Sequence, residues 1–110
     1  MSRVYDTVSA AVEALVHITE SKIEAALGRE PERLLALLQE ELDHLHTLDQ
    51  WQEACMTLPP AEKEALRRRV LHWQERVRFL QEVLQQQLGY LDFLRSLFGP
   101  ALPRGVDLGF

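Results

Sequence analysis

Glu41 and His44 form a Glu-x-x-His motif, the arrangement in this sequence best suited to metal chemistry. That spacing places a carboxylate and an imidazole on one helix face, as in bundles that hold two metal ions. Such a site needs a second pair of this kind, and the sequence contains none. The heptad pattern also directs His17, His44 and His72 to solvent and His46 to a flank. We therefore expect no metal site and no cofactor, and a metal-binding bundle stays as a second alternative.

Other reactive groups do not assemble into a recognisable catalytic pattern. Cys55 is the single cysteine, which excludes an intrachain disulfide and predicts an inert buried thiol. There is no glycine-rich phosphate loop, and a slender helical bundle has little room for a catalytic pocket. The basic run Arg67–Arg69, together with Arg76 and Arg78, is predicted to be a solvated face that also pairs with the second helix, because a net charge of −5 opposes nucleic-acid binding. We expect the protein not to be an enzyme.

Composition predicts an all-α fold. The 110 residues contain 20 leucines, 12 glutamates and 8 glutamines, which favour helices, and no Asn-Gly or Asp-Gly hairpin signal. The longest apolar run, Leu34–Leu38, is far shorter than the roughly 20 residues that cross a bilayer. Residues 1–6 lack the charged-then-apolar order of a signal peptide, so we expect a cytoplasmic protein without membrane insertion.

Helix-breaking residues divide the chain into three segments. Gly28 suits the left-handed position that ends a helix, and Pro31 suits the first position of the next. Pro59 and Pro60 end the second segment and begin the third. Gly99-Pro100 ends the third segment. The predicted helices span about 2–27, 31–57 and 60–98, within one domain of residues 1–98 followed by a tail of residues 99–110.

Apolar residues recur every three or four positions in each segment, which predicts one buried stripe per helix. Short turns and this spacing predict an antiparallel three-helix up-down-up bundle with coiled-coil-like packing. Residues 1–58 carry a charge of −7 and residues 59–110 a charge of +2, which suits an acidic hairpin lying along a basic third helix. The predicted stripes are Val4, Val8, Ala11, Leu15 and Ile18; Leu35, Leu38, Leu42, Leu45 and, less cleanly, Leu48 and Gln52; and Leu66, Val70, Trp73, Val77, Leu80, Leu84, Gln87, Leu91, Leu94 and Phe98.

The third helix is longer than its partners and should overhang them beyond about Gln87. Its last turns are too apolar to stay in water, so they need a cover. The tail, a second copy of the protein or the amphipathic helix of a partner could provide it. The predicted partner-binding residues are Leu84, Leu88, Tyr90, Leu91, Phe93, Leu94, Leu97 and Phe98.

Two stretches resemble the flagellar export chaperones of the FlgN type. The segment Glu20–Gly28, a short turn and Leu34–Glu41 resemble the family's helical hairpin. Trp73-Gln74-Glu75 and Leu80, followed by Gln85–Leu94, resemble its long last helix. The resemblance covers residues 8–98 in order. It implies a cytoplasmic type III export chaperone, active in flagellum biogenesis, that binds helical C-terminal segments of hook-associated proteins and keeps them export-competent. A self-associating helical structural or adaptor protein, buried as a homodimer without a client, is the first alternative.

Overall fold

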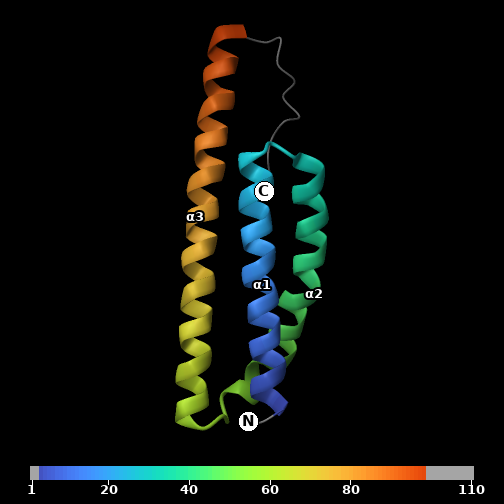
Figure 1. The fold of residues 1–110 in the computed structure, drawn as a ribbon, viewed down its shortest axis with the longest axis vertical. Helices are drawn as coiled ribbons and strands as arrows, with labels where there is room; N and C mark the ends of the chain where they lie inside the picture. The colour runs from blue at the N-terminus through green and yellow to red at the C-terminus, as the bar shows by residue number, and fades with distance from the viewer. Residues whose placement is uncertain (1–2, 99–110) are drawn as a thin grey trace.

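The computed structural model describes the backbone of residues 3–98 and the side chains of residues 3–86. Three helices follow one another: α1 spans Arg3–Leu27, α2 spans Pro31–Cys55 and α3 spans Pro60–Phe98 (Figure 1). Neighbouring helices run in opposite directions, and no strand occurs between residues 3 and 98. The predicted all-α, up-down-up three-helix bundle is therefore confirmed.

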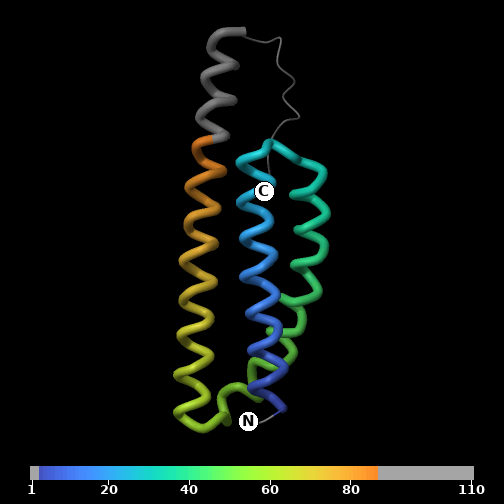
Figure 2. Tube along the Cα trace, viewed as in Figure 1, coloured from blue at the N-terminus to red at the C-terminus, as the bar shows by residue number. Residues whose placement is uncertain are grey.

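α1 is the central helix of the bundle. It packs against both α2 and α3, whereas α2 and α3 make few direct contacts with each other. Figure 2 shows α1 between the other two helices in the upper half, with the lower half of α2 passing behind it. Among the described side chains, the largest that are fully buried are Leu15, Val12 and Thr19, all from α1. The hydroxyl of Thr19 donates a hydrogen bond to the carbonyl of Leu15 at 2.8 Å, which satisfies this buried polar group.

The lower cluster of the core joins all three helices near the α2–α3 turn. α1 contributes an aromatic ring and three valines, and α2 contributes a leucine, Trp51 and Cys55 from its second half. α3 contributes Ala65, Leu66 and Val70. Trp73 packs against the same cluster. The buried members are Tyr5, Val8, Val12, Leu58 and Leu66.

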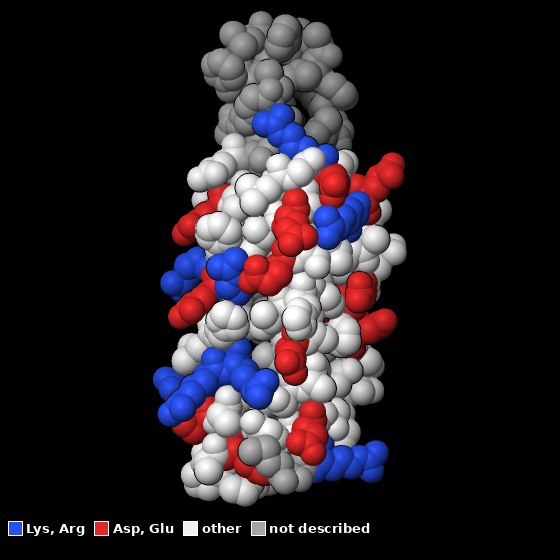
Figure 3. All heavy atoms as spheres, in the orientation of Figure 1, with Lys and Arg blue, Asp and Glu red and all other residues white. Residues whose placement is uncertain are grey.

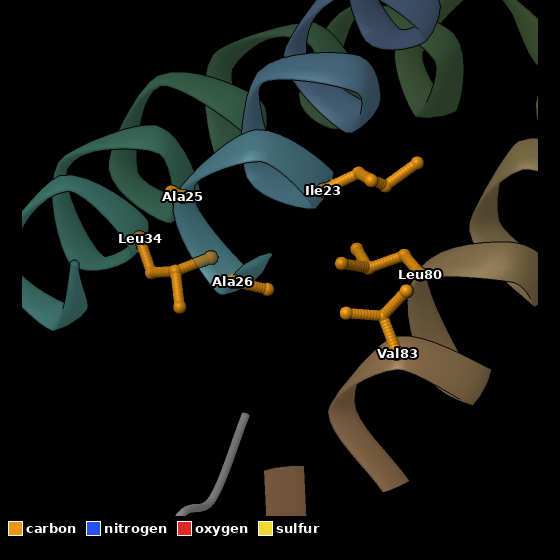
Figure 4. Packing of buried hydrophobic residues seen from close by; sticks show 6 residues of the cluster. All are labelled: Ile23, Ala25, Ala26, Leu34, Leu80 and Val83. Atoms are coloured by element: carbon orange, nitrogen blue, oxygen red, sulfur yellow. The ribbon is translucent and has the colours of Figure 1, made fainter. Parts of the chain in front are cut away.

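The upper cluster closes the other end of the bundle (Figure 4). Two alanines at the end of α1 keep the backbones close, while Leu34 approaches them from α2 and Leu80 and Val83 approach Ile23 from α3. Leu37 and Leu84 pack against its edge. Its buried members are Ile23, Ala25, Ala26, Leu34, Leu80 and Val83.

The turn between α1 and α2 is a Schellman motif with arginine in its left-handed position. The Glu30 N–H donates to the Ala25 carbonyl at 2.9 Å, and the Arg29 N–H donates to the Ala26 carbonyl at 3.2 Å. Arg29 has φ of 54°, so the prediction that Gly28 takes the left-handed conformation is wrong. Gly28 instead continues the helical pattern by donating to the Glu24 carbonyl at 2.9 Å. Pro31 opens α2 as predicted.

Replacing Arg29 with glycine should leave the protein about 0.5–1 kcal/mol more stable than replacing it with alanine. A left-handed conformation costs a residue with a Cβ about 1–2 kcal/mol, and the greater freedom of glycine in the unfolded chain cancels part of this gain. Urea denaturation followed by circular dichroism measures the difference. Arg29→Ala is the matched control, because it removes the same side chain but keeps the Cβ. Equal stability of the two variants would show that the left-handed backbone costs nothing here.

The turn between α2 and α3 is tight and partly buried. α2 ends at Cys55, two residues before the predicted end at Thr57. The N–H groups of Met56, Thr57 and Leu58 each donate to the carbonyl three residues earlier, which tightens the chain into a narrower turn before Pro59. Leu58 is buried in the lower cluster, and α3 begins at Pro60 as predicted.

Candidate functional site

The predicted partner-binding residues lie where α3 leaves the bundle. Leu84 is half-buried and packs against the upper cluster. The α3 backbone continues to Phe98, beyond the turn that joins α1 to α2 (Figure 1). Fourteen residues follow Leu84 in this helix, or about 21 Å of length. The other predicted residues lie outside the described side chains: Leu88, Tyr90, Leu91, Phe93, Leu94, Leu97 and Phe98.

The buried face of α2 differs from the predicted one. Leu35 is 59% exposed and Leu42 is 63% exposed, so the prediction that both belong to the core is wrong. The packed face starts one residue earlier and follows Leu34, Leu37, Glu41, Leu48 and Cys55. A charged residue, Glu41, occupies this face, which is why the sequence pattern favoured the neighbouring face of leucines. We call Leu35, Leu38, Leu42 and Leu45 the α2 leucine stripe; Leu38 and Leu45 are half-buried.

An ion pair accommodates Glu41 between the helices. Lys22 Nζ of α1 donates to the two carboxylate oxygens of Glu41 at 3.1 and 3.2 Å. Only 12% of the lysine side chain and 15% of the glutamate side chain are exposed. A charge in such a position is tolerated only when it is paired, so Lys22 allows this face of α2 to turn inward.

α1 also supplies the partner for the basic side of the bundle. Arg76 of α3 forms a two-bond ion pair with Glu20 of α1, one of its hydrogen bonds measuring 3.1 Å. This hydrogen bonding raises the pKa of Arg76. The guanidinium also lies 4.9 Å from the ring centre of Phe79. The predicted pairing of the arginines with the second helix is therefore wrong for Arg76, because α1 lies between α2 and α3.

The Glu-x-x-His motif does not form a metal centre in the described part of the chain. Glu41 is occupied by Lys22, and residues 3–86 bring no three His, Cys, Asp or Glu side chains together for an ion. His17 and His72 are exposed, as predicted from the heptad pattern. His44 is half-buried rather than solvent-facing, because the packed face of α2 includes it.

Two shallow hollows, neither of which sequence reasoning identified, lie along α3. The first, about 360 Å³, combines Arg68, Arg69 and His72 of α3 with His17 and Glu13 of α1 over a floor of valines. Its cations could attract an anion, but Glu13 faces the same space and Glu64 forms an ion pair with Arg68. In the sequence, the four-residue spacing of Arg68 and His72 could have indicated the α3 side of this hollow. Only the packing of α1 against α3 shows that His17 lies opposite these two residues.

The second hollow, about 470 Å³, has α3 residues as its described lining, among them Trp73, Val77 and Gln81. The indole Nε1 of Trp73 is buried and has no hydrogen-bond partner among the described residues. A buried N–H without an acceptor is costly, so this ring contributes to the core through its area rather than through its polar atom.

Cys55 lies at the end of α2, half-buried against the lower cluster. Burial raises the pKa of its thiol, which favours the protonated form at neutral pH. Because the thiolate is the nucleophilic form, this environment lowers the reactivity of the sulfur.

The fold places the protein in the class of all-α three-helix bundles, with one helix longer than the other two. No family model, characterised protein or solved structure matches this chain. None of its helices, over the residues described, is long and apolar enough to span a membrane.

Proposed function

We propose that this protein is a cytoplasmic export chaperone of the FlgN type that binds amphipathic helices of flagellar hook-associated proteins. The observation that carries the proposal is the length of α3, which has 39 residues where α1 and α2 have 25 each. The upper cluster ends the three-helix packing near Leu84, and the turn where α1 ends and α2 begins lies below the last turns of α3 (Figure 1).

The sequence of those last turns suits a helical partner. Leucines and aromatic residues recur at three- and four-residue spacing from Leu84 to Phe98. An amphipathic client helix can lay its apolar face against such a stripe, and aromatic anchors often supply much of the binding energy. Covering the apolar face of the client helix in this way before secretion would keep the client unfolded and unaggregated until export. The resemblance of residues 8–98 to the chaperone family points to the same role.

The test is binding of peptides from the C-terminal helices of hook-associated proteins to the full chain. The double variant Leu91→Asp, Leu94→Asp should weaken binding at least about tenfold, because it places two charges in the proposed contact. Fluorescence anisotropy measures the affinity, and circular dichroism confirms that helicity is kept.

Leu71→Asp is the matched control, because Leu71 lies on the bundle part of α3 and is 42% exposed. It should leave peptide affinity unchanged. Full binding by the Leu91, Leu94 double variant would contradict the proposal. A homodimer that persists at nanomolar concentration in sedimentation experiments, and that the double variant dissociates, would support the self-associating alternative instead.

A further inference from the structure

The α2 leucine stripe is the most apolar part of the described surface of α2. Leu35 and Leu42 stand two turns apart on one side of the helix and are mostly exposed, with half-buried Leu38 and Leu45 beside them. From Leu35 to Leu45 the stripe is about 15 Å long, or three helical turns. A row of leucines at this spacing is the surface that a second amphipathic helix packs against.

Carboxylates bracket this stripe at both ends. Glu32 lies one turn before Leu35, and Asp49 and Glu53 continue the same side of the helix after Leu45. All three are exposed. The only arginine or lysine of α2, Arg33, is paired with Glu24 and Glu30 on the other flank. Figure 3 shows acidic side chains along the α2 edge of the molecule and basic side chains gathered over α3.

We propose that the α2 leucine stripe is a docking site for a basic amphipathic helix of another protein, separate from the surface on the last turns of α3. The partner has leucine-sized residues over about three turns and lysines or arginines at both ends, which meet Glu32 on one side and Asp49 and Glu53 on the other. The leucines supply the buried area, and the carboxylates select the charge and orientation of the partner.

Charge also excludes a second copy of the protein and the chain's own residues 99–110 as occupants of the stripe. Two copies of α2 placed face to face would oppose their carboxylates. The basic surface of a second copy lies on α3, at the opposite edge of the molecule, so pairing it with α2 is head-to-tail and would not close into a dimer. The chain's own residues 99–110 contain one arginine and one aspartate, and therefore lack the positive charge.

The experiment uses the full chain and two synthetic helical peptides of about 18 residues. Both carry leucines at three- and four-residue spacing; one has lysines at its ends, and the other has glutamates in their place. The basic peptide should bind at least about tenfold more tightly than the acidic one. Its affinity should fall as the salt concentration rises, because salt shortens the range of electrostatic attraction. The double variant Leu35→Gln, Leu42→Gln should lose at least about tenfold in affinity for the basic peptide.

Two variants separate this site from the proposed chaperone surface. Leu71→Gln removes an equally apolar, partly exposed residue from α3 and should bind the basic peptide normally. The Leu91→Asp, Leu94→Asp variant should also bind it normally, even if that variant loses hook-associated peptides. Unchanged binding by the Leu35, Leu42 double variant would overturn the inference. So would equal binding of the acidic peptide, or a homodimer that only this double variant dissociates.

Discussion

Replacing Leu15 with alanine should lower the free energy of unfolding by about 2–5 kcal/mol. Leu15 lies at the middle of α1, the central helix, and its side chain is completely buried. α2 and α3 both pack against this helix, so neither can close fully over the space that the lost methyl groups leave. Urea denaturation followed by circular dichroism measures the loss. The dependence of the free energy of unfolding on urea concentration should be compared between the variants.

Leu42→Ala is the matched control, because it deletes the same atoms from a leucine that is 63% exposed. Its effect should stay within about 0.5 kcal/mol. A loss as large as that of Leu15→Ala would place Leu42 in the core, as the sequence pattern suggested, and would contradict the packing of α2 described above.

Replacing Lys22 with methionine should destabilise the protein by about 1–3 kcal/mol. The change leaves the carboxylate of Glu41 without its partner between two helices, where only 15% of the glutamate side chain reaches solvent. Breaking a fully buried pair costs about 3–5 kcal/mol, and the residual exposure of this pair reduces that loss. Chemical denaturation of the single and double variants provides the measurement.

The double variant Lys22→Met, Glu41→Leu should recover most of that stability, because it replaces both charges with apolar side chains of similar size. The resulting double-mutant cycle isolates the coupling between the two residues. Arg33→Met serves as the exposed control and should destabilise the protein much less than Lys22→Met, because its ion pairs with Glu24 and Glu30 are open to solvent. A coupling near zero would mean that Lys22 and Glu41 do not determine which face of α2 is buried.

These two predictions bear directly on the surface of the protein. The face of α2 that carries Glu41 is packed inward, and Leu35 and Leu42 of the α2 leucine stripe are exposed as a consequence. In the double variant, leucine at position 41 removes the only charge from the packed face, so the stripe should stay exposed and its affinity for the basic peptide should be kept.

The number, order and direction of the helices could be predicted from the sequence because they depend on local chemistry. Apolar spacing defines each helix, and Pro31, Pro59 and Pro60 break the chain whatever surrounds them. The length of α3 could be predicted from the same features, and this length indicates the candidate surface near its end. The burial of Val8, Leu15 and Ile18 was also predictable, because no charge interrupts that stripe of α1.

Only the tertiary structure decided which face of α2 is buried, which helix lies in the centre and which residue adopts the left-handed turn. Glu41 points inward because Lys22, nineteen residues earlier, pairs with it across the helix interface. Arg29 takes a conformation typical of glycine because the hydrogen bonds of the turn begin one residue later than expected. The buried face of α2 and the central place of α1 depend on contacts between residues far apart in the sequence, and a pattern along one helix contains no record of such contacts.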